Sequence, residues 1–385
     1  MSMATIAPPW SSDDEALALR ETARKFFETE AVPNRQRWAD QRMIDRQFWL
    51  DAGKLGLLCL AIPEEYGGGG GTFAHDMVVL EEQSRIDEPG FGNHVHSGIV
   101  APYLLAYGTE EQRHRWLGRM ATGEAIAAIA MTEPGAGSDL ANMSTRAVRR
   151  GDEYVIDGAK TFITNGGSAD LILLAAKTDP AGGAHGVSLF LVDANNCPGF
   201  QRGRVLDKLG QHSGDTAELF FDGARVPADS LLGEVEGMGF AQLMTQLPQE
   251  RLLLAVSAVV SAQRAVDLAV EYTKERHAFG KPLFAKQHVK FQLAECATLA
   301  RVARVFIDDC VAQHLSGTLD VATASMAKYW TTDIQCQVID RCLQLFGGNG
   351  YMREYPIAEM YANARAQRIY GGANEIMKEL IARTL

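Results

Sequence analysis

The sequence predicts an α+β protein with an N-terminal α-helical domain (residues 1–123), a central antiparallel β domain (124–235) and a C-terminal helical bundle of the four-helix type (236–385). Two observations predict this class. Apolar residues recur at helical spacing in both flanking regions, and the C-terminal region contains long stretches without Gly or Pro. The central region holds short apolar or alternating runs between Gly, Asp and Asn turns, as in a barrel or sandwich.

The N-terminal region opens with a helix-start signal. Ser11 and Ser12 precede three acidic residues, and apolar residues then recur at helical spacing until Pro33. A run of five glycines at residues 67–71 predicts a loop. Because no Lys-Ser or Lys-Thr pair follows these glycines, the run does not predict a phosphate cradle.

The central and C-terminal regions differ in the length of their apolar runs. The strand-like runs are short and cover residues 154–156, 161–163, 171–176, 187–192 and 219–221. The helical stretches are long and cover residues 249–279, 283–316 and 318–346. They predict three long antiparallel helices, the first of which opens at Pro248.

Charge and cysteine usage exclude several classes of protein. The net charge of −11 argues against non-specific binding to nucleic acid or to an anionic membrane. The six cysteines form no CxxC pair and no zinc spacing, so we expect buried free thiols, a reducing compartment and a cytoplasmic protein. We see no secretory signal in the first fifteen residues, and the most apolar run (252–262) is too short for a membrane span.

A glycine-rich turn at residues 131–139 reads Met-Thr-Glu-Pro-Gly-Ala-Gly-Ser-Asp. Pro134 ends any preceding element, and Gly135 and Gly137 allow a ligand to approach the main chain. The hydroxyls of Thr132 and Ser138 would suit a flat heterocycle at one end and a phosphate at the other. The turn is not a dinucleotide fingerprint, since Leu140 takes the third glycine position, and an ordinary turn explains the residues equally well.

A second segment, residues 160–166, places an aromatic residue two positions before a threonine. On a strand, Phe162 could lie against a planar cofactor while Thr164 offers a hydroxyl at its edge. Phe162 as an ordinary core residue is the alternative reading.

Together these two segments resemble the acyl-CoA dehydrogenase family. The resemblance continues in order through residues 208–216, 276–280, 344–351 and 369–376, so it covers nearly the whole chain. It implies the α–β–α fold of that family, an FAD cofactor, an acyl-CoA substrate and electron-transfer flavoprotein as the electron acceptor. It also implies a homotetramer, because the family completes its cofactor site with residues of a neighbouring subunit.

The resemblance implies cofactor contacts for individual residues. Those expected to contact FAD within one subunit are Met131, Thr132, Gly137, Ser138, Phe162, Thr164, Ala373 and Glu375. Those matching contacts to a neighbouring subunit's FAD are Arg276, Phe279, Gln344 and Gly348, and Gln287 also matches a cofactor-contact position. Arg276 suits a pyrophosphate as a charge-assisted donor, with a surface ion pair as the alternative. Ala373 stands where the family usually has threonine, so we expect one hydroxyl contact to be missing.

The catalytic base is expected at an unusual position. Many family members carry a glutamate directly after the tyrosine of the C-terminal motif, but here Gly371 follows Tyr370. The long-chain and isovaleryl branches place the base at the glutamate corresponding to Glu250, and the long-chain resemblance is the closer one. Burial against an acyl chain should raise the pKa of Glu250 toward the working pH. The alternative is a carboxylate that interacts with a helix N-terminus.

The remaining site predictions concern the substrate. Gly371 is expected to offer its backbone N–H to the thioester oxygen, and Tyr370 and Ser138 are expected to contact the substrate. Arg251 either orients Glu250 or meets the CoA moiety, with a structural ion pair as the alternative. His94 and His96 form an HxH pair without a third ligand, so we expect no metal site.

The sequence thus predicts FAD-dependent α,β-dehydrogenation of a fatty acyl-CoA to the trans-2-enoyl-CoA, in fatty acid β-oxidation. The alternatives are an isovaleryl-type dehydrogenase of short branched chains and a non-catalytic FAD-binding subunit of a hetero-oligomer. An oxygen-using acyl-CoA oxidase fits less well, because we expect such an enzyme to carry a longer C-terminal extension.

Overall fold

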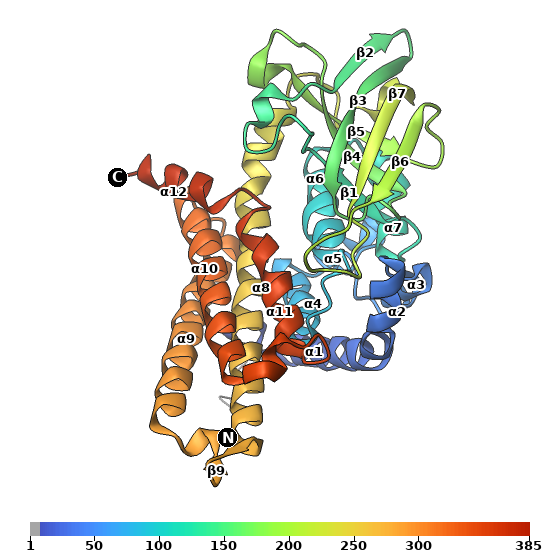
Figure 1. The fold of residues 1–385 in the computed structure, drawn as a ribbon. Coiled ribbons are helices and arrows are strands. Elements are labelled where there is room, and N and C mark those ends of the chain that lie inside the picture. The colour runs from blue at the N-terminus through green and yellow to red at the C-terminus, as the bar shows by residue number, and fades with distance from the viewer. Residues whose placement is uncertain (1–7) are drawn as a thin grey trace.

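The computed structural model describes residues 8–385, which form three regions in the order α, β, α (Figure 1). The predicted fold class is therefore confirmed. The expectation that no secretory signal is present rests partly on residues 1–7, which lie outside the described residues.

The N-terminal region consists of short helices packed around an aromatic core that contains Trp38, Phe48 and Phe91. The first helix begins one step later than predicted, because Asp13 and not Ser11 or Ser12 caps it, accepting a hydrogen bond from the Ala16 N–H at 2.7 Å. The helices of this region are α1 (Asp14–Phe26), α2 (Arg35–Gln41), α3 (Arg46–Lys54), α4 (Phe73–Ile86), α5 (Asn93–Val95), α6 (Ala101–Tyr107) and α7 (Glu110–Ala121).

The central region is a seven-stranded sheet in the order β1-β4-β2-β3-β7-β6, with β5 paired to β4. Its strands are β1 (Ala127–Ala130), β2 (Arg146–Arg150), β3 (Glu153–Ile163), β4 (Leu171–Lys177), β5 (Val187–Asp193), β6 (Phe200–Val205) and β7 (Ala217–Pro227). Most pairs are antiparallel, as predicted, but β1 and β2 both run parallel to β4. Parallel neighbours need a long crossover, which the β2–β3 hairpin and its flanking turns supply between β1 and β4.

The C-terminal region contains the three predicted long helices: α8 (Gly239–Glu275), α9 (Gln287–Leu315) and α10 (Val321–Leu345). The strands β8 (His277–Ala278) and β9 (Lys281–Pro282) form a hairpin between α8 and α9, and the shorter helices α11 (Pro356–Arg365) and α12 (Asn374–Ala382) follow α10. The predicted start of the first helix is wrong. Helix α8 begins at Gly239 and runs through Pro248, so Pro248 interrupts one helical hydrogen bond without ending the helix.

Helix α8 is the longest element, and it runs along both the sheet and the bundle (Figure 1). By length and composition alone, α8 could cross a membrane. The apolar run at residues 252–262, which we judged too short for a membrane span, is only a part of this helix. However, 67% of its most apolar window is buried inside the protein. Its apolar residues pack against α4, α9 and α10 in the largest core cluster, which is the position of a core helix.

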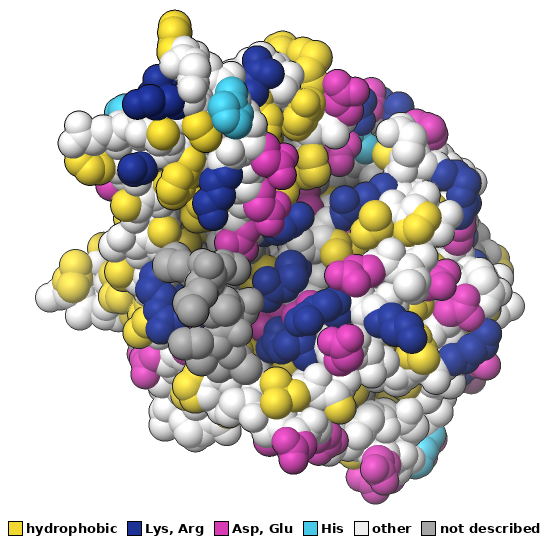
Figure 2. Space-filling view, turned by 90° about the horizontal axis from the view of Figure 1, so that it is seen from below, with side chains coloured by type: hydrophobic (Ala, Val, Ile, Leu, Met, Phe, Trp, Pro, Cys, Tyr) yellow, Lys and Arg dark blue, Asp and Glu magenta, His cyan; other side chains and the backbone are white. Residues whose placement is uncertain are grey.

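Charged side chains on the face seen from the lower end of the molecule are mixed in sign. Figure 2 shows acidic and basic side chains interspersed there, with exposed hydrophobic side chains between them. Among the described residues on this face, basic side chains thus lie next to acidic ones.

Candidate active site

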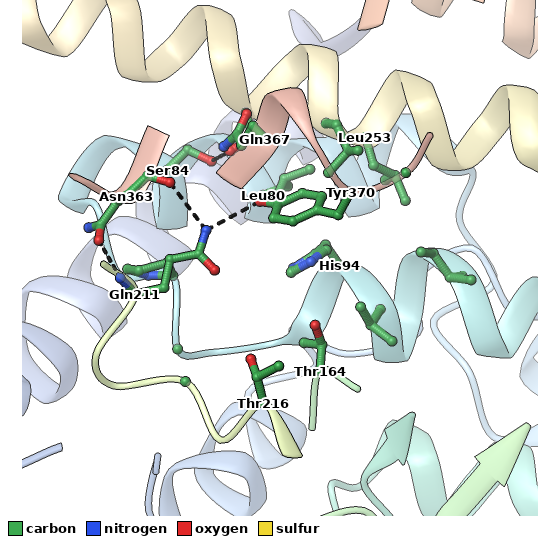
Figure 3. Close-up of a pocket in the computed structure, with 18 of the residues that line it drawn as sticks. Leu80, Ser84, His94, Thr164, Gln211, Thr216, Leu253, Asn363, Gln367 and Tyr370 are labelled. Carbon is green, nitrogen blue, oxygen red and sulfur yellow. Dashed lines mark hydrogen bonds between the residues drawn. The ribbon is translucent and has the colours of Figure 1, made fainter. Parts of the chain in front are cut away.

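A cavity of about 200 Å³ lies where the three regions meet. Helix α4, the end of strand β3, helix α8 and the segment between α11 and α12 each contribute to its wall. Figure 3 shows Leu80, His94, Leu253 and Tyr370 among the side chains around it. The cavity is thus formed by segments that are far apart in the sequence.

Seven of the predicted site residues line this one cavity. They are Met131, Thr132, Phe162, Thr164, Glu250, Tyr370 and Gly371. The predicted cofactor segments and the predicted catalytic residues therefore face a common space, as a reaction between a cofactor and a substrate requires. Gly137 and Ser138 do not line the cavity and lie exposed farther along the same turn as Met131.

Glu250 lies in the interior of α8, and only 5% of the residue is exposed. The Tyr103 hydroxyl donates a hydrogen bond to its Oε1 at 2.7 Å. Burial raises the pKa of Glu250 to about 7, and Tyr103 and Arg251 oppose this shift only in part. A carboxyl group with this pKa is ionised in a useful fraction near neutral pH and is still basic enough to accept a proton.

The position of Glu250 within α8 argues against the alternative that it is a carboxylate interacting with a helix N-terminus. Because α8 begins at Gly239, Glu250 lies about three turns inside the helix. The dipole effect is confined to the first turn, so it does not explain a carboxylate here.

Gly371 has a left-handed backbone conformation, with φ of +65°. A Cβ atom at this position would approach Cδ1 of Leu254 to 2.3 Å, which is a severe overlap. Leu254 lies on α8 one turn after Glu250. A side chain at residue 371 would therefore require the Leu254 side chain to move, and it would also have to adopt the left-handed φ of this position. Within residues 8–385 the Gly371 N–H has no protein acceptor, so it is free to donate into the cavity.

The turn at residues 131–139 is tied to strand β3 by a buried ion pair. Nζ of Lys160 lies 2.8 Å from Oε1 of Glu133 and also donates to the Met131 carbonyl at 2.9 Å. Burial alone would raise the pKa of Glu133, but its hydrogen bonds to Lys160, Ser144 and Thr145 outweigh burial and hold the pKa at about 2. The two segments that resemble cofactor motifs are thus one structural unit.

This unit fits a flat ligand with a polar tail. Phe162 sits at an irregularity of β3 with φ of +60°, and 68% of it is exposed, so it is not the core residue of the alternative reading. An aromatic residue in this strained conformation exposes a ring face beside the cavity. Added Cβ atoms at Gly135 and Gly137 would meet nothing within 4 Å, so the backbone of the turn is open to close approach. These features match an isoalloxazine ring at Phe162 and a diphosphate at the turn.

The start of α12 adjoins this site. Ala373 takes the N-cap position without a side-chain hydrogen bond, and Glu375 is exposed. The following Asn374 is buried and is held by Lys328, whose Nζ lies 2.9 Å from its Oδ1. A threonine at residue 373 would cap this helix, so the absence of its hydroxyl leaves a helix N-terminus uncapped.

Arg251 points away from the cavity into the bundle. It is buried, and its Nη1 donates to Oγ of Ser325 on α10 at 3.3 Å. No carboxylate of the described chain lies within 4.0 Å of it, so the alternative of a structural ion pair is not observed. Its charge lowers the pKa of Glu250, whereas a contact with CoA stays a prediction.

The four residues predicted to contact a neighbouring subunit's FAD, and Gln287 with them, lie together at the far end of the bundle. Arg276 precedes the β8–β9 hairpin, and Phe279 lies in its turn. Gln287 begins α9, Gln344 lies in the last turn of α10, and Gly348 lies just after that helix. All five are exposed, and Phe279 reaches 95% exposure. Figure 1 shows this hairpin at the opposite end of α8 from the sheet. They therefore do not reach the cavity of their own chain.

Three residues in or beside the cavity were not predicted as site residues from the sequence. Tyr103 holds Glu250, and Gln211 donates to the Tyr370 hydroxyl at 3.3 Å. His94 lines the cavity, and burial lowers the pKa of its imidazole to about 4. His96 instead bonds the Met120 carbonyl in the interior. The HxH pair is therefore divided between the cavity and the core, and the described residues contain no group of three metal-ligand side chains.

Comparison with known proteins agrees with this geometry. Models of the acyl-CoA dehydrogenase N-terminal, middle and C-terminal domains match residues 13–124, 128–224 and 237–385. The long-chain specific acyl-CoA dehydrogenase, mitochondrial, of Mus musculus is 48% identical over 368 residues, which cover 95% of this chain and 85% of the mouse protein.

Two solved structures extend the likeness to the fold. An acyl-CoA dehydrogenase from Geobacillus kaustophilus is 47% identical with a TM-score of 0.94, over 97% of this chain and 98% of that one. A glutaryl-CoA dehydrogenase from Mycobacterium smegmatis, in complex with FADH2, is 27% identical with a TM-score of 0.89, over 97% and 94%. The chain belongs to the acyl-CoA dehydrogenase family.

Proposed function

We propose that this enzyme catalyses the FAD-dependent α,β-dehydrogenation of a fatty acyl-CoA to the trans-2-enoyl-CoA, as a step of fatty acid β-oxidation. One observation carries the proposal. The buried carboxyl of Glu250, with its pKa raised to about 7, lines the same cavity as Phe162 and Thr164 of the predicted cofactor segments.

The residues around Glu250 have defined tasks in this proposal. Glu250 removes the α-proton of the thioester, and the Tyr103 hydroxyl holds its carboxylate in place. The Gly371 N–H donates to the thioester oxygen as that oxygen gains negative charge. Loss of one donor of this kind typically costs about 10²–10³ in rate.

The cofactor segments would place the acceptor of the hydride that leaves the β-carbon. Bound FAD supplies the hydride acceptor. Phe162 and Thr164 would hold its ring, and the turn from Met131 to Ser138 would hold its diphosphate, with Ala373 and Glu375 at the start of α12 nearby. The apolar side chains of Leu80, Leu253 and Leu254 exclude water from the acyl chain.

We infer a medium-to-long acyl chain from the 48% identity to a long-chain specific enzyme. The position of the base supports the same branch, because Gly371 carries no carboxylate and Glu250 on α8 supplies one instead. Electron-transfer flavoprotein is the proposed electron acceptor.

We further propose a homotetramer in the cytoplasm. The exposed Phe279 and Tyr351, at 95% and 85%, lie at the bundle end that would contact a neighbouring copy. The described cysteines are all free thiols, which supports a reducing compartment.

An anaerobic titration tests the proposed function. The FAD-loaded protein is mixed with acyl-CoA thioesters of increasing chain length, and bleaching of the flavin absorbance is recorded. We expect bleaching with medium or long chains. Bleaching only with short branched chains would favour an isovaleryl-type enzyme, and none with any chain would favour a non-catalytic FAD-binding subunit.

The variant Glu250→Gln tests the assignment of the base in the same titration. We expect bleaching to slow by about 10²–10⁴. Glu271→Gln is the matched control, because Glu271 is exposed on the same helix and does not line the cavity. Near-normal bleaching by Glu250→Gln would refute the assignment.

A further inference from the structure

The cavity continues along α8 beyond the reacting centre. After Glu250, the residues of α8 that line it are Leu253 and Leu254, and then Ser257 and Ser261. At the rise of an α-helix, the two serines lie ~10 Å and ~16 Å from Glu250 along the helix axis. Along α8, the cavity wall is therefore apolar beside Glu250 and polar farther along the helix.

The two serines belong to a larger polar group, which we call the serine–glutamine end. Its members are Ser84 on α4, Ser257 and Ser261 on α8, Gln335 on α10, and Gln367 just after α11. Ser84 donates to Oγ of Ser257 at 2.9 Å, which ties α4 to α8 at this depth. A pocket for a plain hydrocarbon chain would have no use for these groups.

The two glutamines are unpaired within the described chain. Gln335 and Gln367 are only 1% and 9% exposed, yet the Oε1 atom of each is buried with no hydrogen-bond partner. The same holds for Gln83, which also lines the cavity. Turning either carboxamide over would leave its nitrogen unpaired instead. Buried polar atoms are almost always satisfied, so the three amide oxygens around this cavity can each accept a hydrogen bond from a donor inside it.

Charge determines the kind of ligand. Among the described residues that line the cavity there is no Lys or Arg, whereas Asp87 and Glu88 are present. A carboxylate on the acyl tail would therefore meet no cation. A hydroxyl group is neutral, donates to an amide oxygen, and accepts from a serine hydroxyl.

We propose that the substrate is a fatty acyl-CoA bearing a hydroxyl group in the distal part of its chain, bound at the serine–glutamine end. The proposal rests on the proposed acyl-CoA dehydrogenase function. The hydroxyl donates to Oε1 of Gln335 or Gln367 and accepts from the serine hydroxyls. The apolar stretch of Leu253 and Leu254 holds the methylene groups between it and the thioester.

The test compares matched pairs of thioesters. For each of several chain lengths, a straight-chain acyl-CoA and its terminal hydroxy analogue are measured for kcat/KM and, with the Glu250→Gln variant, for Kd by calorimetry. We expect the hydroxy analogue to be favoured about tenfold in both quantities at one window of chain length. Equal values at every length would overturn the proposal and would indicate that water fills the polar end.

Two variants locate the effect. Gln335→Met and Gln367→Met should each reduce the preference for the hydroxy analogue, measured within each variant as the ratio of kcat/KM for the hydroxy and plain thioesters. Gln263→Met is the matched control, because Gln263 on α8 also has a buried Oε1 without a partner but does not line the cavity. A preference unchanged in both cavity variants would also overturn the proposal.

Failure of this proposal is distinguishable from failure of the proposed function. If plain acyl-CoA bleaches the wild-type flavin but no preference exists, only the hydroxyl inference fails. If no thioester of either series bleaches the flavin, the dehydrogenase function fails. The Kd comparison with Glu250→Gln still decides whether the polar end recognises a hydroxyl group, because it requires no turnover.

Discussion

The hydroxyl of Tyr103 donates a 2.7 Å hydrogen bond to Oε1 of Glu250, and this bond joins α6 of the N-terminal region to α8 of the C-terminal bundle. Both groups are buried, and Glu250 is the predicted base. Burial and the neighbouring Glu250 carboxylate raise the pKa of Tyr103, so its phenol stays protonated and keeps its role as donor.

Replacing Tyr103 with phenylalanine should move the pH profile of the reaction. The hydrogen bond lowers the pKa of Glu250, so its loss raises that pKa above about 7. Because the base must be ionised, the acidic limb of kcat/KM then shifts to higher pH, and activity at neutral pH falls by up to about tenfold. Tyr107→Phe on the same helix is the control. A profile that does not move would exclude Tyr103 as a positioning residue.

The Glu250→Gln variant should be more stable than the wild type at alkaline pH. The pKa of Glu250 rises from 4.5 to about 7 on folding, so the folded state binds the proton more tightly. The wild type then loses stability as the pH rises from about 4.5 to 7, by at most ~3 kcal/mol. Thermal unfolding at pH 5 and pH 8 measures this. A difference in Tm between variant and wild type that is the same at both pH values would contradict the raised pKa.

Moving the base to residue 371 should fail. In Glu250→Gln/Gly371→Glu the new side chain would collide with Leu254 and would start from a left-handed φ. We expect flavin bleaching to stay at least about 10²-fold below the wild type, the usual contribution of a general base. Adding Leu254→Ala removes the collision and should recover part of the rate. Full recovery in the double variant would show that Leu254 does not prevent the exchange.

Lys160→Met should weaken both the fold and cofactor binding. It leaves the Glu133 carboxylate buried without its cation, which typically costs about 3–5 kcal/mol. Unfolding in urea and the dissociation constant for FAD measure the two effects. The double variant Glu133→Gln/Lys160→Met removes both charges and should be more stable than Lys160→Met alone. If the double variant is no more stable, an unpaired charge is not the cause.

Ala373→Thr should strengthen FAD retention. The hydroxyl would cap α12 and restore the contact that the family usually makes, and a cap is typically worth about 1 kcal/mol. The measurement is the dissociation constant of FAD from the reconstituted protein. Ala373→Val has a similar shape without the hydroxyl and serves as the control. Equal tightening in both variants would assign the effect to packing.

The sequence predicted the parts of this protein that are encoded locally. Helical spacing predicted the long helices, and the ordered motifs led to Glu250, which is the predicted base because residue 371 has no carboxylate. The start of α8 was wrong because Pro248 is normally a helix breaker, whereas packing of α8 between sheet and bundle overrides that preference. The parallel β1–β4 pair was missed because pairing depends on segments more than forty residues apart.

The sequence also did not predict single residues that contribute to the site from outside the main motifs or without an assigned role. Tyr103 belongs to no chemical pattern, His94 was considered only as part of an HxH pair, and Gln211 lies within one of the family motifs without an assigned role. They meet the site only through contacts such as Tyr103 with Glu250, at a sequence separation of 147 residues. Spacing along the chain carries no signal for such a contact.

The Glu133–Lys160 pair has a consequence for how the protein acquires its flavin. The pair and the Thr161–Thr132 backbone hydrogen bond hold the turn against strand β3, so contacts within the protein position the segments expected to bind the cofactor. A preorganised binding site loses little conformational entropy when a ligand binds. Apoprotein that has lost its flavin should therefore regain it rapidly, without a slow refolding step.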